Sequence, residues 1–190
     1  MSTATTAAPA LASVFTAPNG SGNAINNCMT LGVSNVDATI TLTVLDIYGT
    51  PVVAYPREDM WLETSLLGLL PCTDGTIADA DTDVSGQTTF SAAVYAGGGS
   101  AYVPPTVSET TIVVIDGTPL AQPGLEILFN SGDLSMDRII GVQDTALFKP
   151  LYVDATTNGT YYYEIDYYFD GAVTLSDLVL FAGTMNTTCP

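Results

Sequence analysis

The chain reads Asp133-Leu-Ser135-Met-Asp137-Arg138-Ile139-Ile-Gly141-Val-Gln-Asp144, and 33 positions later it reads Asp166-Tyr-Tyr168-Phe-Asp170-Gly171-Ala172-Val-Thr174-Leu-Ser-Asp177. Each copy is followed by an apolar Leu-Phe pair. Oxygen-bearing side chains recur at positions 1, 3 and 5, and a carboxylate recurs at position 12. A twelve-residue calcium loop has this spacing, because Ca²⁺ takes six to eight oxygen ligands. The repeat therefore predicts that at least one of the two loops binds Ca²⁺.

The two loops depart from the ideal pattern in opposite ways. In the first loop, Arg138 takes the glycine position and brings a positive charge. In the second loop, Gly171 keeps that position, but Tyr168 stands where Asp or Asn is usual. Acidic turns that only cap helices are the alternative interpretation, because Asp is favoured in the first turn of a helix. The predicted ligands are Asp133, Ser135, Asp137, Ile139 (backbone carbonyl) and Asp144 in the first loop, and Asp166, Tyr168, Asp170, Ala172 (backbone carbonyl) and Asp177 in the second.

The stretch from Asp170 to Ala182, read as DGAVTLSDLVLFA, resembles a line that closes many bacterial secreted proteins. The paired loops of residues 133–185 look like the duplicated calcium-loop module of dockerins. This resemblance implies a small α-helical module with paired EF-hand-like loops. Such modules dock enzymes to scaffolds in some proteins and complete a domain in others. We expect helices to start near Val142 and Leu175, to end at Pro150 and Gly183, and to pack through Leu147, Phe148, Leu178 and Phe181.

Upstream of the loops the pattern is mainly β. Ile40, Leu42 and Val44 alternate with threonines, which is typical of a strand with one buried face. Further short strands are expected at residues 58–63, 76–81, 87–95, 110–116 and 125–130, with turn residues between them. This spacing favours a β-sandwich. Trp61 is interpreted as an aromatic residue of its core.

Two segments of this region, TITLTVLDIYGTPV and ADADTDVSGQTTFSAAV, resemble the Ig-like domains of bacterial surface proteins. The resemblance spans residues 36–130 and implies an Ig-like β-sandwich and an extracellular location, without catalytic residues. The expected organisation is an N-terminal arm at 1–27, an Ig-like β-sandwich at 28–131, and a dockerin-like module at 132–190. The N-terminal stretch has neither the basic start nor the apolar segment of a signal peptide, so we expect the mature form of a secreted protein or a chain whose start was assigned rather than translated.

Charge excludes several function classes. The chain has three basic residues, 20 acidic residues and no histidine, which gives a formal net charge of −17. Nucleic acids and anionic membrane surfaces both require Lys and Arg, so neither is an expected partner. No apolar run approaches the roughly 18 residues that span a bilayer, so membrane insertion is not expected. Without histidine there is no base for a nucleophilic triad, and we predict that the protein is not an enzyme.

Three cysteines allow one disulfide in an oxidising compartment. If strands 39–46 and 60–63 are antiparallel neighbours, Cys28 and Cys72 lie at the same end of the sheet, so we predict the pair Cys28–Cys72. Asn19, Asn158 and Asn186 match the pattern of N-glycosylation acceptors.

Two clusters leave alternatives open. Asp79, Asp81 and Asp83 would project from one face of a strand, either as a cation site or, as we favour, as a solvated face. The tyrosines of residues 161–168 would either stack on glycans or, as we favour, pack the connector between the loops onto the sandwich.

Residues 1–36 contain no charged side chain. We expect the arm, with Leu11, Val14 and Phe15 on its apolar side, to insert as a donated β-strand into an adjacent copy. Repetition of that contact builds a head-to-tail homopolymer. The sequence therefore favours a calcium-stabilised extracellular filament subunit. The alternative is a docking or glycan-binding adhesion module on a cell surface.

Overall fold

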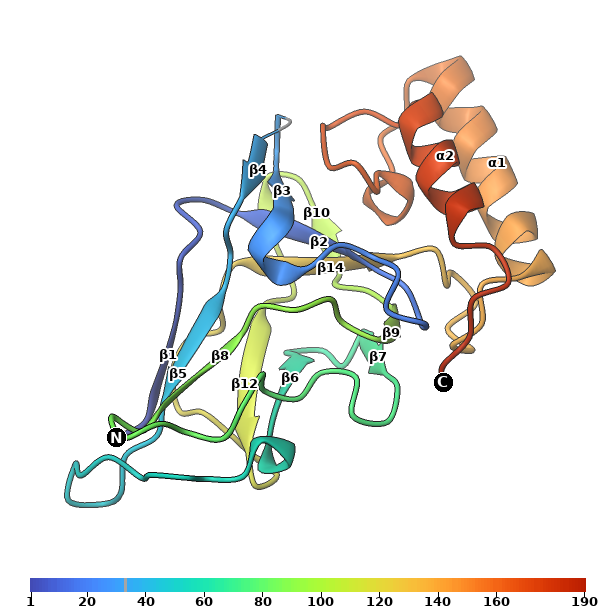
Figure 1. Cartoon of the computed structure of the whole chain (residues 1–190). Helices are drawn as coiled ribbons and strands as arrows, with labels where there is room; N and C mark the ends of the chain where they lie inside the picture. The colour runs from blue at the N-terminus through green and yellow to red at the C-terminus, as the bar shows by residue number, and fades with distance from the viewer. Residues whose placement is uncertain (33) are drawn as a thin grey trace.

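The computed structural model describes residues 1–32 and 34–190 and shows a mainly β chain with two α-helices near its C-terminal end (Figure 1). The predicted mainly β class is thereby confirmed. We call residues 1–131 the β region and residues 132–190 the C-terminal module. Among the described residues, no helix is both long and apolar enough to cross a membrane.

The β region contains several small sheets. One has the strand order β14 (Ile127–Ser131), β2 (Ala12–Thr16), β3 (Cys28–Thr30) and β4 (Ser34–Val36). A second has the order β1 (Thr3–Thr6), β5 (Ile40–Thr43) and β8 (Gln87–Phe90), and a third has β13 (Thr118–Pro119), β12 (Thr111–Ile115) and β6 (Met60–Thr64). Two-stranded sheets pair β7 (Leu69–Pro71) with β9 (Ala96–Gly98) and β10 (Tyr102–Val103) with β11 (Thr106–Val107). Short 3₁₀ turns occupy Ile25–Asn27, Arg57–Asp59 and Tyr163–Ile165.

Side-chain alternation explains the core of these sheets. Ile40 and Leu42 of β5 are fully buried, whereas the intervening threonines are partly exposed. In β6, Leu62 is fully buried but Trp61 is only partly buried, and its indole N–H donates to Glu63 at 2.8 Å. The prediction of Trp61 as a core aromatic was therefore wrong, because its position in the strand alternation lies opposite to that of Leu62.

Strands β2 and β14 are buried on both faces. They run parallel, with Val14 in register with Phe129. Val14 and Phe129 pack into the main core of the β region, whereas Phe15 and Leu128 point to the other side and pack against the C-terminal module. In Figure 1 these two strands cross the molecule between the sheets that contain β5 and β12 and the two helices. They therefore form a layer shared by both parts of the chain.

The predicted arm of residues 1–27 pairs within its own chain in this structure. Strand β1 is antiparallel to β5, with Thr3 opposite Thr43 and Thr6 opposite Ile40. Strand β2 lies between β14 and β3. Leu11 packs against a cluster that includes Leu128, and Val14 lies in the main core. The arm is thus part of the sheets rather than a separate segment.

The C-terminal module contains α1 (Val142–Asn158) and α2 (Leu175–Gly183). The prediction that the first helix ends at Pro150 was wrong, because α1 continues to Asn158 and is capped by Gly159 with φ of 72°. Pro150 is exposed, and the following Leu151 and Tyr152 pack against the apolar cluster beneath the helices, which supports the continued helix. The second helix ends at Gly183 as predicted.

Phe148 and Phe181 join the two helices with stacked rings whose centroids are 4.5 Å apart. Both side chains are buried, and Leu178 packs against the same cluster. Leu147 is 46% exposed and does not take part, contrary to the prediction, because one residue of rotation places it on the outer side of α1. We call the cluster of Phe15, Ala17, Ile140, Phe148, Ile165, Tyr167 and Phe181 the module core.

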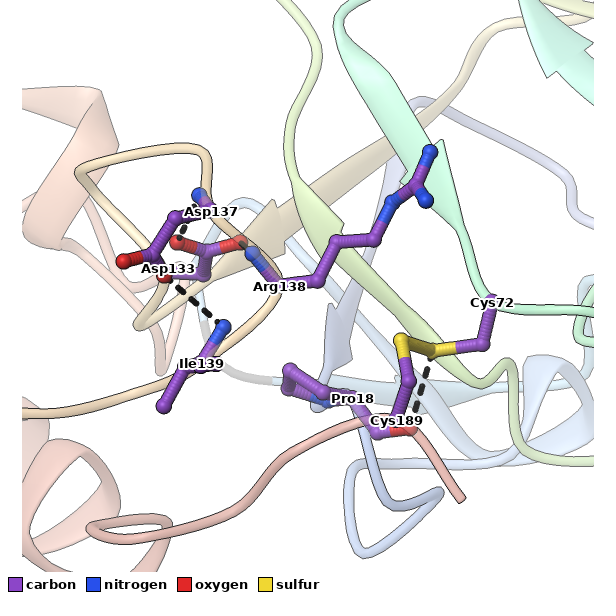
Figure 2. The surroundings of a disulfide bond; sticks show 7 residues. All are labelled: Pro18, Cys72, Asp133, Asp137, Arg138, Ile139 and Cys189. Atoms are coloured by element: carbon purple, nitrogen blue, oxygen red, sulfur yellow. Dashed lines mark hydrogen bonds between the residues drawn. A yellow bond between two sulfur atoms is a disulfide. The ribbon is translucent and has the colours of Figure 1, made fainter.

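The disulfide joins Cys72 to Cys189, with a Cα–Cα distance of 5.5 Å (Figure 2). The predicted pair Cys28–Cys72 was therefore wrong. Its premise was that β5 and β6 are neighbours, but β5 pairs with β1 and β8, whereas β6 pairs with β12. Cys28 is a buried free thiol. The disulfide fastens the C-terminal tail to the β region.

Candidate metal centre

The first loop brings three carboxylates together. Asp133, Asp137 and Asp144 each offer an oxygen, and these oxygens lie within 4.8 Å of one another. Asp133 and Asp144 are buried, and Asp137 is exposed. Within residues 1–32 and 34–190, this is the one such group of three acidic, Cys or His side chains. The three carboxylates that the spacing predicts as ligands therefore lie close together, and their role as ligands stays a prediction.

Backbone N–H groups fix the two buried carboxylates of the first loop. Asp133 accepts from the N–H of Asp137 at 3.0 Å and from the N–H of Arg138 at 2.8 Å. Asp144 accepts from the N–H of Ser135 at 2.8 Å and from the N–H of Gly141 at 2.7 Å. The chain therefore wraps around the carboxylates at positions 1 and 12, and their oxygens are held in place by the loop itself.

The second loop repeats this arrangement position by position. Asp166 accepts from the N–H groups of Asp170 at 3.2 Å and Gly171 at 3.0 Å. Asp177 accepts from the N–H groups of Tyr168 at 2.9 Å and Thr174 at 2.8 Å. In both loops position 1 accepts from positions 5 and 6, and position 12 accepts from positions 3 and 9. The duplication in the sequence is thus a duplication in geometry.

Position 6 has a left-handed backbone conformation in both loops. Arg138 has φ of 66° and Gly171 has φ of 85°, so each loop turns through the left-handed region that glycine adopts most easily. The Arg138 side chain is exposed and extends away from Asp133 and Asp137 (Figure 2). Its positive charge is therefore directed away from the carboxylates.

The other residues predicted as ligands make hydrogen bonds within their own loops. The Ser135 hydroxyl is 3.5 Å from a carboxylate oxygen of Asp133. The Ile139 N–H donates to Asp137 at 2.9 Å, and the Ala172 N–H donates to Asp170 at 3.0 Å, so position 7 has the same backbone setting in both loops. Tyr168 contributes its N–H to Asp177, and its side chain is 37% exposed.

The three carboxylates of the first loop could hold a metal ion. They offer oxygen donors only, which suits a hard cation. Of the described residues, no cysteine or histidine joins this group. In the second loop, Asp166, Asp170 and Asp177 do not converge to the same degree. The first loop is therefore the better-formed candidate site.

Burial makes these carboxylates costly to ionise without a cation. Burial raises the pKa of Asp133 and Asp177 above the usual range for a carboxyl group. It raises the pKa of Asp166 to about 6, and the nearby charge of Asp177 adds to the effect. A bound cation would offset both the desolvation and the repulsion.

Sequence reasoning missed the role of Tyr161. Its hydroxyl donates to Asp166 at 2.9 Å, so it supports position 1 of the second loop from outside the loop. In the sequence Tyr161 belongs to a run of tyrosines, and the favoured interpretation of that run was packing of the connector onto the sandwich. That interpretation fits Tyr163 and Tyr167, which are buried, and the Tyr163 hydroxyl donates to the carbonyl of Phe129 at 3.0 Å.

The acidic residues Asp79, Asp81 and Asp83 accept hydrogen bonds from nearby residues. Asp79 accepts from the hydroxyls of Thr89 at 2.8 Å and Ser91 at 2.7 Å. Asp81 accepts from the N–H of Arg57, and Asp83 accepts from two N–H groups in its turn. These acids therefore organise loops. The three possible glycosylation acceptors, Asn19, Asn158 and Asn186, are all exposed.

The tail after α2 ties the first loop to the β region. The N–H of Ile140 donates to the carbonyl of Thr187 at 2.9 Å, and the N–H of Asn186 donates to the carbonyl of Ile140 at 2.7 Å. Cys189 then forms the disulfide with Cys72. The candidate metal centre is thus bounded by the helices, the tail and the shared strands. No family model, no curated protein and no solved structure matches this chain.

Proposed function

We propose that this protein is a secreted structural protein, an Ig-like β-sandwich with a dockerin-like calcium module, and that it forms a homopolymeric extracellular filament by exchange of its N-terminal arm. The observation that carries the proposal is the position of β2. This strand comes from the arm, yet it lies between β14 and β3 and all five of its residues are buried. A sheet that requires such a strand accepts it equally well from a neighbouring copy.

The physical basis is that strand exchange preserves every native contact. The segment 17–27 connects β2 to β3 and is the natural hinge, with glycines at 20 and 22. When β1 and β2 leave their own subunit, the same backbone hydrogen bonds and the same pockets for Val14 and Phe15 are available in the next subunit. A heterologous exchange whose rotation does not close into a ring builds an open fibre.

Calcium has a stabilising role in this proposal. Asp133, Asp137 and Asp144 would hold an ion in the first loop, with the Ser135 hydroxyl and the Ile139 carbonyl completing the set. The equivalent residues, Asp166, Tyr168, Asp170, Ala172 and Asp177, are proposed to hold a second ion. The ion neutralises buried carboxylates and thereby stabilises the module that packs on β2 and β14.

A cross-linking experiment tests the exchange. Thr5 of β1 lies opposite Thr41 of β5, and both side chains are accessible on the outer side of the sheet. A Thr5→Cys, Thr41→Cys variant treated with a short bismaleimide should give a ladder of multimers on a denaturing gel, alongside fibres in negative-stain micrographs. The single variant Thr5→Cys is the control and should give no ladder. Exclusively intramolecular linkage in samples that contain fibres would contradict strand exchange.

A second candidate function has one observation in its favour. The helices expose apolar residues on their outer sides, including Val142 at 84%, Leu175 at 67% and Val179 at 62%. A docking or glycan-binding adhesion module would use such a surface for its partner. Substitution of Leu175 and Val179 by serine distinguishes the two functions: loss of attachment to a surface with fibres intact supports docking, whereas loss of fibres supports a contact between subunits.

A further inference from the structure

A cavity of about 470 Å³ lies beside the first calcium loop, at the junction of the β region and the C-terminal module. Its walls come from the segments at residues 66–68, 98–103 and 130–136. Its size is within the range of small-molecule sites, and it adjoins the carboxylate cluster, because Asp133 contributes to one wall. Neither the calcium loops nor strand exchange requires this space.

The mouth of the cavity is apolar. Leu66 is 64% exposed, Val103 is 70% exposed and Met136 is 58% exposed, and all three line the cavity. Apolar side chains gathered around a concave site are left exposed at a cost in free energy unless something covers them. A bound molecule with an apolar chain lying along these three side chains would shield them from water and remove that free-energy cost.

The depth of the cavity contains a buried carboxylate. Glu109 is 2% exposed and accepts from the N–H groups of Leu66 at 3.1 Å, Gly68 at 2.8 Å and Ala101 at 2.7 Å. A carboxylate has about four acceptor positions, so these three donors leave one for a further donor. Backbone donors hold Glu109 firmly, but they do not supply a formal positive charge.

The charge of the lining is of one sign. Glu109 and Glu164 line the cavity together with Asp133, whose charge the proposed ion would neutralise, and none of the basic residues Arg57, Arg138 and Lys149 does so. Negative side chains in a concave site with apolar walls repel anions and concentrate cations. A molecule that fits this lining is therefore cationic at one end and apolar along its body.

We propose that this cavity binds a primary ammonium group carried on an apolar stem. The ammonium lies at Glu109, where its N–H groups reach the free acceptor position, and the stem lies along Leu66, Val103 and Met136. A primary ammonium fits better than a guanidinium, because it is compact and its donors rotate. A free alkylamine and a lysine side chain of a partner share this chemistry.

Titration of the native protein with hexylammonium tests the inference, with hexanol and hexanoate as matched probes of the same length. We expect binding of one hexylammonium per chain, roughly tenfold tighter than hexanol because of a charge-assisted hydrogen bond, and no binding of hexanoate. Equal affinity for hexylammonium and hexanol would overturn the role of the carboxylates. The measurement needs no fibres, so its failure leaves the filament proposal unaffected, and the reverse also holds.

Two pairs of variants locate the site. Ala101→Trp places a large ring in the cavity and should abolish binding, whereas Ala182→Trp on the exposed side of α2 should not. Glu164→Gln removes one charge from the lining without removing a buried group, and it should weaken hexylammonium binding several-fold; Glu58→Gln is the control. Unchanged binding in Ala101→Trp would overturn the location.

A comparison of hexylammonium with N-acetyl-lysine amide separates the two sources. Tighter binding of the lysine derivative identifies a protein partner as the source, and tighter binding of hexylammonium identifies a free amine. Failure of both to bind would overturn the proposed ligand class.

Discussion

The ring of Phe15 lies 5.0 Å from the ring of Tyr167, centroid to centroid. Phe15 belongs to the N-terminal arm, and Tyr167 follows the first residue of the second loop. The contact joins the two ends of the chain through the module core. Folding of the arm and folding of the C-terminal module are therefore expected to be one cooperative event.

Truncation of Phe15 tests this cooperativity. Phe15→Ala should lower the free energy of unfolding by about 3 to 5 kcal/mol, because it removes a buried aromatic side chain. Urea unfolding followed by tyrosine and tryptophan fluorescence should still show one transition. Tyr48→Ala is the control, since Tyr48 is 86% exposed. A change near zero in the free energy of unfolding would show that the arm does not stabilise the C-terminal module.

Deletion of residues 1–16 should unfold the β region, because β14 and β3 then lose the strand that lies between them. Addition of a synthetic peptide of residues 1–16 should restore the far-ultraviolet circular dichroism spectrum. A peptide with Val14→Asp is the control and should fail, because Val14 is fully buried. A well-folded deletion variant without peptide would argue against strand exchange as the basis of assembly.

Removal of calcium should lower the melting temperature. A ligand that binds only the folded state stabilises it by about 2.7 kcal/mol at a concentration a hundredfold above Kd. Asp144→Asn should reduce the calcium-dependent shift, and Asp177→Asn reports the second loop in the same way. Asp74→Asn is the control, because Asp74 is exposed and its φ of 56° is also accessible to Asn. Identical melting curves with calcium and with chelator would refute the metal role.

The pH dependence of stability should reverse with calcium. Burial raises the pKa of Asp166 to about 6, above its value of about 3.9 in the unfolded chain. The folded state then holds the proton more tightly, so metal-free protein should lose stability as pH rises from about 4 to 6. With calcium the ligands must be ionised, so stability should rise over the same interval. Melting temperatures of dialysed protein check this, and Asp166→Asn should weaken the metal-free trend.

Thiol labelling checks the disulfide. Burial raises the pKa of Cys28 to about 11, so its thiol should not react with Ellman's reagent at pH 8 until the chain unfolds. Unfolded, non-reduced protein should release one equivalent, and peptide mapping should place the label on Cys28. A label on Cys189 would instead indicate the pair Cys28–Cys72.

The geometry of the two acidic loops could be predicted from the sequence because it is local. Asp133 and Asp144 are close in the chain, and the backbone donors to each carboxylate come from the same loop. Strand alternation in β5 is local in the same sense. Spacing therefore carries the information, and the first loop converges as its spacing indicates.

The errors concern contacts between distant segments. The parallel pairing of Val14 with Phe129 and the disulfide Cys72–Cys189 depend on how sheets meet, which no local pattern encodes. Pro150 shows a related effect, since packing of Tyr152 against the module core outweighs a local signal to end the helix. The cavity beside Glu109 also arises only when separate segments come together.

The disulfide between Cys72 and Cys189 also sets how far a subunit can be stretched. It closes a sequence separation of 117 residues, so a force applied to the two chain ends passes directly from Cys72 to Cys189. At roughly 3.5 Å per extended residue, about 400 Å of chain is withheld from extension. In the proposed fibre, the segment from Cys72 to Cys189 would therefore not extend under load unless the disulfide is reduced.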